Sequence, residues 1–143
     1  MESGRRNRQP AHDPRTDARE RALHVLYEAR AKSLSGRQVI EAQVLPVDEM
    51  TADIVGGIDD NGQDIDSRIS NHAVGWTLSR MPVIDLSVLR MATFELVFRR
   101  AVPTGVIINE AVELVKRFST DESPRFVNGV LSAIAREVRP QEN

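Results

Sequence analysis

The chain has 143 residues, of which 41% are apolar and 28% are charged, and its formal net charge is −2. These values are typical of one soluble globular domain with a sizeable core. The chain contains no cysteine, which excludes disulfides and thiolate metal sites. No apolar run reaches the roughly 18 residues that span a membrane, and the N-terminus lacks the hydrophobic segment of a secretory signal, so we expect a cytoplasmic protein.

The small net charge conceals an uneven distribution along the chain. Residues 1–37 carry a net charge of +4, residues 38–67 carry −8, and residues 68–143 carry +2. All but two of the 19 basic residues are arginine, which suits bidentate phosphate contacts and stacking on bases. A genome rich in arginine codons would give the same count. The acidic stretch 48–66 is interpreted as the solvated face of a long helix.

The first third of the chain predicts an arm followed by two helices. Residues 1–12 lack periodicity and are expected to form a flexible, arginine-rich arm ahead of one helical domain over 13–140. The pair Asp13-Pro14 is typical of a helix start, so a first helix is expected from there to about residue 32. Ser35 and Gln38 have the spacing of a capping box and predict a short second helix.

Residues 48–72 present conflicting patterns. Ile54, Ile58, Ile65 and Ile69 are spaced four, seven and four apart, which fits one face of a long helix and fits no strand. Two glycine-containing pairs at positions 56–57 and 61–62 favour a break instead. We expect one continuous helix, because the apolar stripe keeps its phase across both pairs.

The second half predicts a turn at Trp76 and three further helices. These helices are expected over about 85–99, 105–118 and 123–138, with a break at Pro103. No stretch alternates with the period of a strand. The sequence therefore predicts an all-α fold with six to seven helices packed as two small helical bundles.

The last helix starts with the segment SPRFVNGVL, whose Ser123 is suited to cap it. Phe126 and Asn128 fall on opposite flanks of its apolar stripe, and Gly129 falls nearly behind it. We expect the glycine to let another backbone come close, since it costs about 1 kcal/mol of helix stability relative to alanine. Asn128 either binds a ligand or ties this helix to its neighbour, and the tie is favoured.

An enzymatic function has one candidate in the sequence. His24 has Glu20 and Glu28 four residues away on either side, a spacing that could form an acid–base pair or part of a metal site. An ordinary solvated helix face explains the pattern better. The sequence also lacks nucleotide-binding loops and hydrolase motifs. We predict no catalytic residue, no metal ligand and no cofactor.

Nucleic-acid binding has more support. Six arginines fall within seventeen positions: Arg5, Arg6, Arg8, Arg15, Arg19 and Arg21. Arg15 and Arg19 are i, i+4 neighbours and are expected to project from one face, so that arm and helix together could follow a phosphate backbone. A solubilising tail is the alternative. Of the few aromatic side chains, Tyr27 is expected in the core or at its rim, and Phe126 is a candidate for stacking on a base.

Several segments together resemble the NusB family of bacterial transcription antitermination factors. They are DARERALHVLYEA, WTLSRMPVIDLSVLRMATFEL, VIINEAVELVKRFSTDESPRFVNGVL and the terminal VRP. The resemblance extends from about residue 15 to residue 140. It implies a non-enzymatic protein that binds the single-stranded boxA element of ribosomal RNA transcripts together with the ribosomal protein NusE, within the RNA polymerase antitermination complex. Members of the family occur as monomers and as dimers, and the resemblance leaves both open.

The resemblance, together with the arginine pattern, predicts two sets of contact residues. The RNA contacts are Arg5, Arg6, Arg8, Arg15, Arg19, Tyr27, Glu122, Arg125, Phe126 and Asn128. The expected contacts to the protein partner are Tyr27 and Asp85. Asp85 is also well placed to be a helix N-cap, and Glu122 to interact with a helix dipole.

Two other functions fit parts of the sequence. One is an RNA-recognition module like that of ribosomal RNA cytosine methyltransferases, but no cofactor-binding domain follows in these 143 residues. The other is a purely structural interaction protein, which would not prefer boxA over scrambled RNA.

Overall fold

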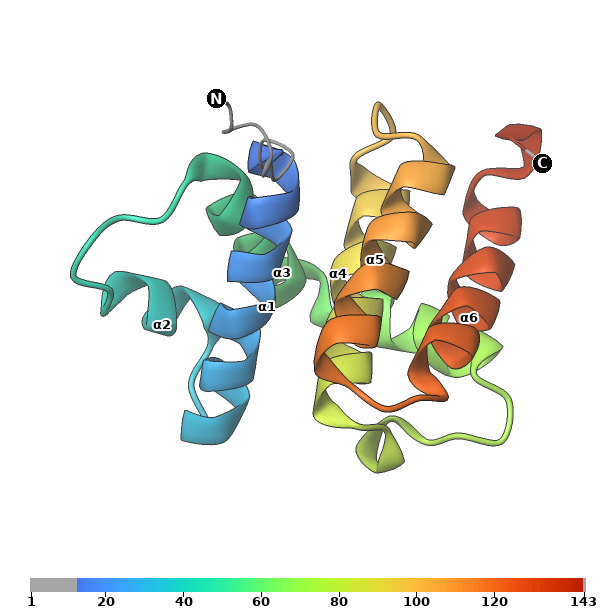
Figure 1. The fold of residues 1–143 in the computed structure, drawn as a ribbon, viewed down its shortest axis with the longest axis horizontal. Coiled ribbons are helices and arrows are strands. Elements are labelled where there is room, and N and C mark those ends of the chain that lie inside the picture. Colours follow the sequence, from blue (N-terminus) through green and yellow to red (C-terminus); the bar gives the residue numbers. More distant parts are fainter. Residues whose placement is uncertain (1–12, 143) are drawn as a thin grey trace, which may run out of the picture.

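The computed structural model describes residues 13–142, which form six α-helices and two 3₁₀ helices, with no strand in that range. The helices are α1 (Pro14–Lys32), α2 (Gly36–Glu41), α3 (Glu49–His72), η2 (Leu78–Arg80), α4 (Val83–Phe98), α5 (Thr104–Phe118), α6 (Ser123–Val138) and η3 (Pro140–Glu142). Figure 1 shows α1 and α2 on one side and α5 and α6 on the other, with α3 running behind α4 from the first side to the second. The predicted all-α fold is confirmed. No helix within residues 13–142 is long and apolar enough to cross a membrane.

Local side-chain hydrogen bonds explain where the first two helices begin. The carboxylate of Asp13 accepts a hydrogen bond from the backbone amide of Arg15, and proline occupies the first helical position. At α2, the amide of Gln38 donates to Ser35 Oγ, while the Gln38 side chain accepts from the Ser35 amide. The predicted helix start and the predicted capping box are therefore both confirmed.

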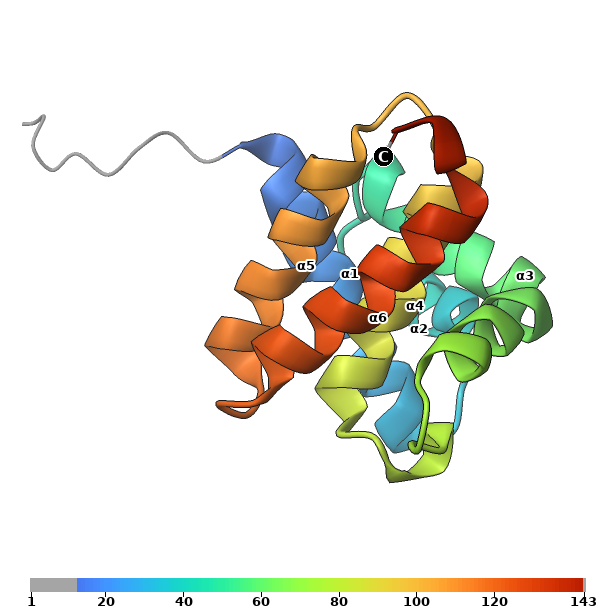
Figure 2. The same ribbon diagram turned by 90° about the vertical axis from the view of Figure 1, so that its right-hand side faces the viewer.

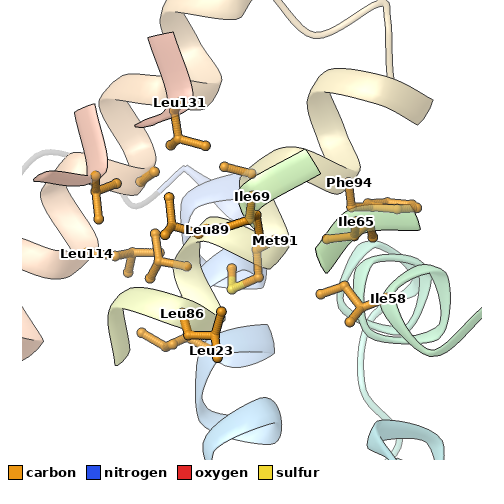
Figure 3. Packing of buried hydrophobic residues seen from close by; sticks show 14 of the residues in the cluster. Leu23, Ile58, Ile65, Ile69, Leu86, Leu89, Met91, Phe94, Leu114 and Leu131 are labelled. Carbon is orange, nitrogen blue, oxygen red and sulfur yellow. The ribbon is translucent and has the colours of Figure 1, made fainter. Parts of the chain in front are cut away.

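Helix α4 lies at the centre of the fold. It packs against α1, α3, α5 and α6, and eleven of its sixteen residues are buried. A helix that is buried on almost every side must be apolar nearly all round, which explains the dense run VIDLSVLRMATFELVF. The buried side chains form one hydrophobic cluster that extends from α1 to α6, and Figure 3 shows part of it around Leu89 and Met91.

Helix α3 continues through its glycine pair and bends further along. Gly57 packs so close to α4 that a Cβ there would overlap the ring of Phe94. The first glycine-containing pair therefore allows close helix packing and is not a break. Asn61 has non-helical backbone angles of φ −121° and ψ 22°, and its side-chain amide donates to the carbonyl of Gly57 at 2.8 Å. Two helical segments therefore meet at a kink at Asn61, so the expectation of one continuous helix is wrong there, and the pair at positions 61–62 correctly favoured a break.

The acidic stretch 48–66 is not simply a solvated helix face. Asp59 accepts hydrogen bonds from the backbone amides of Gly36 and Arg37 at the start of α2. Its neighbours pair with arginines, and these pairs are Asp60 with Arg37, Asp64 with Arg68, Asp66 with Arg90, and Asp53 with Arg99. The negative charge of α3 is therefore used to hold α2 and α4 in place.

The C-terminal end of α4 is capped by a side chain from the end of α6. Arg139 is buried, and its guanidinium donates to the carbonyls of Glu95, Leu96 and Arg99 at 2.9–3.2 Å and to that of Val102 at 2.7 Å. Leu96 lies in the last turn of α4, where carbonyls lack the amides of a following turn, whereas the carbonyls of Glu95 and Arg99 also accept a backbone amide. Arg139 thus ties the end of α6 to the end of α4, and Figure 2 shows α6 crossing in front of α4, against which it packs.

Candidate nucleic-acid and partner interface

The first turn of α6 presents most of the predicted contact residues at the surface. Glu122, Arg125 and Asn128 are exposed, and Phe126 is half-buried. Neither Arg125 nor Asn128 makes a side-chain hydrogen bond or ion pair within residues 13–142, so the predicted tie from Asn128 to a neighbouring helix is wrong. Gly129 has no atom of the described chain near the position of a Cβ, so the expected close backbone approach is also wrong within this chain.

Ser123 and Asp85 belong to a buried network behind this turn. Ser123 Oγ donates to Asp85 at 2.9 Å, and Ser119 Oγ donates to the other carboxylate oxygen of Asp85 at 2.6 Å. Ser123 therefore links α6 to α4 and does not cap its own helix, whose N-cap residue is Glu122. Asp85 is likewise no N-cap, because α4 already begins at Val83. It is only 2% exposed, so a partner could reach it only by entering a cavity.

Such a cavity lies next to the first turn of α6 and has a volume of about 400 Å³. The lining residues are Trp76, Pro82, Asp85, Thr120, Glu122, Ser123, Arg125 and Phe126. The rings of Trp76 and Phe126 meet there, with centroids 5.7 Å apart and planes tilted by 56°. Four predicted contact residues from two helices thus share one cavity. From the sequence, Trp76 was predicted only to lie in a turn. The signal that could have identified it is a lone tryptophan outside the predicted helices, in a chain poor in aromatic residues.

The two predicted RNA contacts on α1 lie in different surroundings, one exposed and one buried. Arg15 is exposed, and Asp13 is the carboxylate beside it. Arg19 is 4% exposed and donates two hydrogen bonds of 2.8 Å to Glu95 of α4, with a longer one of 3.4 Å to Glu110 of α5. The expectation that Arg19 projects beside Arg15 and meets RNA is therefore wrong. Its carboxylate partners hold its pKa above the ordinary arginine value although burial acts in the opposite direction.

Tyr27 lies at the rim of the fold rather than in its core, because half of its surface is exposed. It lines a second cavity of about 280 Å³ with Leu23, His24, Ile84 and Phe118. The two cavities meet α4 at the consecutive residues Ile84 and Asp85. Tyr27 and the α6 turn therefore flank the same end of α4, which places both predicted surfaces near the start of this helix.

The histidine candidate for catalysis does not form a compact site. Glu20 accepts from Arg117 of α5 at 2.7 Å and lies 3.6 Å from His24, while Glu28 pairs with Lys32 at 2.8 Å. His24 itself packs edge-on against the ring of Phe118. Within residues 13–142, no group of three or more metal-ligating side chains converges.

The predicted arm contacts Arg5, Arg6 and Arg8 lie outside the described residues.

These features define a class of protein, namely a small all-helical domain that presents aromatic and cationic side chains together on one helix turn. A sequence model of the NusB family matches residues 16–136. The chain therefore belongs to the NusB family.

Curated relatives support the same family. The transcription antitermination protein NusB of Saccharopolyspora erythraea is 52% identical over 85% of this chain and 86% of its own length. The NusB protein of Thermobifida fusca is 42% identical over 84% of this chain and 87% of its own length.

Solved structures match the fold as well. NusB from T. maritima superposes with a TM-score of 0.81 at 34% identity, covering 91% of this chain and 96% of that one. A structure of the antitermination factors NusB and NusE in complex with double-stranded RNA superposes with a TM-score of 0.73 at 27% identity, covering 86% and 96% of the two chains.

Proposed function

We propose that this chain is a non-enzymatic transcription antitermination factor of the cytoplasm. It binds the single-stranded boxA element of ribosomal RNA transcripts together with the ribosomal protein NusE, and the pair acts within the RNA polymerase antitermination complex. Membership of the NusB family supports this function, and so does the structural likeness to a NusB that was solved with NusE and RNA.

The observation that carries the proposal is the first turn of α6. Arg125 has no carboxylate partner within residues 13–142, and the ring of Phe126 beside it borders an open cavity. A base stacks on an aromatic face while a guanidinium binds the adjoining phosphate, and single-stranded RNA offers both groups. Arg15 on α1 and the arm residues Arg5, Arg6 and Arg8 would add phosphate contacts.

The partner surface is assigned to the end of α4 where Tyr27 is exposed. Tyr27 borders an apolar cavity with Phe118 and Ile84, and a tyrosine with a half-exposed ring is a common anchor in protein interfaces. Asp85 would contribute to NusE binding only through a group that enters the neighbouring cavity.

The direct test is binding of boxA and scrambled oligonucleotides by this protein with and without NusE. We expect boxA to bind more tightly than scrambled RNA and NusE to strengthen binding of boxA. If four phosphates are contacted, log K should fall with log salt concentration with a slope of about −3. Equal binding of both RNAs would instead identify a purely structural interaction protein.

The stacking part of the proposal is tested by Phe126→Ala. Losing one base–aromatic stack should weaken boxA binding by about 1–3 kcal/mol. Phe98→Ala is a matched control, because Phe98 is also a partly exposed ring (37%) but lines a cavity between α3 and α4. Loss of folding without loss of RNA affinity in the folded fraction would show that Phe126 is only a core residue.

A further inference from the structure

Trp76 is held in an exposed position by a turn between α3 and η2. Its backbone amide donates to the carbonyl of Ala73 at 3.0 Å, and Gly75 adopts a left-handed backbone angle, φ +84°. This combination is that of a turn with glycine at its third position, where a residue with a Cβ would be strained. Although half of the Trp76 surface is exposed to solvent, its ring is kept against Phe126 of α6. The turn thus places the indole at a defined position.

The two rings border a cavity whose size and chemistry suit a small flat group. Its volume of about 400 Å³ is within the range of about 300–1,000 Å³ that is usual for small-ligand sites. The cavity wall includes Asp85, a carboxylate that is nine-tenths buried or more and accepts one hydroxyl on each oxygen. Each oxygen keeps a further lone pair, so the carboxylate can still accept from an amino group.

We propose that Trp76 and Phe126 together bind one unstacked base of the RNA, with Trp76 as a second stacking residue. This inference rests on the proposed RNA-binding function and adds a residue and a subsite to it. A base that leaves its neighbours exposes a flat face, which the two rings cover, and amino groups on its edge are donors for the carboxylate of Asp85. The phosphate of the same nucleotide lies within reach of the α6 turn that carries Arg125.

The unpaired guanidinium of Arg125 favours a nucleotide over an apolar protein side chain, although the carboxylates of Asp85 and Glu122 also line the cavity. Arg125 lines the cavity and has no ion pair within residues 13–142, although Asp121 and Glu122 lie four and three residues before it. A guanidinium that leaves neighbouring carboxylates unused is available to an anion. An apolar side chain of a protein partner would cover the rings but would leave Arg125 without a counter-charge, whereas a nucleotide supplies both.

The first measurement uses the intrinsic fluorescence of the full chain. Trp76 is the only tryptophan, so the emission reports on this site alone. Titration with a boxA oligonucleotide should quench the emission, with the same midpoint that a filter-binding assay gives for the RNA. Titration with NusE alone should leave most of the emission unchanged.

The second measurement compares variants at the site. Trp76→Ala should weaken boxA binding about 5- to 150-fold, which is the effect of one lost base stack. Trp76→Phe should retain most of the affinity because it keeps an aromatic face. Val74→Ala is the matched control, since Val74 is 86% exposed on the same turn but has no ring. Thermal unfolding followed by circular dichroism should show all three variants folded.

A set of abasic oligonucleotides then identifies the bound base. Removing one base at a time from boxA should reveal one position whose loss weakens binding to the wild-type protein and has no further effect in Trp76→Ala. Such non-additivity between protein and RNA changes indicates direct contact.

The outcomes separate this inference from the proposed function. If boxA binds with the expected salt dependence but neither quenches Trp76 nor responds to Trp76→Ala, the inference is overturned and the proposed function stands. If Trp76→Ala weakens NusE binding and leaves RNA binding unchanged, the occupant is a protein side chain and the inference is again overturned. If the wild-type protein binds neither RNA, the proposed function and this inference both fail.

Discussion

The acidic face of α3 and the first turn of α6 differ in how completely their polar groups are satisfied. The α3 face has the largest net negative charge of the chain, and its aspartates bond to arginines and backbone amides of α2, α3 and α4. The α6 turn also carries charges, yet the side chains of Arg125 and Asn128 have no hydrogen-bonding partner within residues 13–142. Paired charges thus mark internal architecture here, whereas unmatched side chains beside a cavity mark the candidate site.

The same contrast occurs within α1 and gives the largest predicted effect. Replacing Arg19 with alanine leaves Glu95 as an unpaired buried carboxylate, which should destabilise the protein by about 3–5 kcal/mol in chemical denaturation. Arg15→Ala should change stability by less than about 0.5 kcal/mol and should weaken RNA binding instead.

The Arg19 prediction is controlled by the double variant Arg19→Ala with Glu95→Ala. Removing both partners leaves no unpaired charge, so the loss should be smaller than the sum of the two single losses. Simple additivity would mean that Arg19 and Glu95 act independently, and the buried pair would not be the reason why Arg19 is unavailable to RNA.

Two glycines give the next largest effect, with opposite signs. Gly57→Ala places a methyl group against the Phe94 ring and should destabilise the protein by about 1–3 kcal/mol. Gly129→Ala meets open space on an exposed helix face and should stabilise it by about 0.4–1 kcal/mol. Urea unfolding of both variants is the measurement. Equal shifts in the same direction would contradict the difference in packing.

The sequence predicted local structure well, because the relevant signals are local. The caps at Asp13 and Ser35 and the phase of the isoleucine stripe in α3 depend only on neighbouring residues, and the structure confirms them. The pair at positions 61–62 favoured a break, but the periodicity of the isoleucines outweighed it in the prediction. Periodicity does not register the Asn61 side chain, which donates to the carbonyl of Gly57 at the kink.

The candidate site was predictable only in part. The pattern placed Phe126 on a flank of its helix, and the structure has that ring half-buried beside a cavity. Arg19 was misassigned because Glu95 lies 76 residues away, and no local pattern reveals a long-range partner. Trp76 was missed for the same reason, since its contact with Phe126 joins two segments fifty residues apart.

A smaller effect is expected at the unmatched arginine of α6. Arg125→Ala should reduce the magnitude of the slope of log K against log salt by about 0.7 if it removes one phosphate contact, which is about fivefold in affinity at 0.1 M salt. Arg136→Ala, on the exposed last turn of the same helix, is the control and should leave the slope unchanged. The measurement is a salt series of RNA titrations. An unchanged slope for Arg125→Ala would remove Arg125 from the interface.

The smallest predicted effect concerns Glu20, a carboxylate near the surface that is paired with Arg117. A hydrogen bond from Arg117 holds the pKa of Glu20 below its ordinary value, although burial acts to raise that pKa. A carboxyl with a lowered folded-state pKa stabilises the protein above its unfolded pKa of about 4.3, and this contribution is lost as pH falls through the folded value. Glu20→Gln should therefore cost less than about 1 kcal/mol at pH 7 and progressively less below about pH 4.

The dependence on Arg117 makes the Glu20 prediction specific. In an Arg117→Ala background, the source of the lowered pKa is gone, so adding Glu20→Gln should change the pH dependence of stability very little. Urea unfolding between pH 3 and pH 7 measures all four proteins of this cycle. A full Glu20 effect in the absence of Arg117 would mean that α1 and α5 are not coupled through this ion pair. The charge of Glu20, like that of Arg125, would then contribute nothing to the stability of the fold.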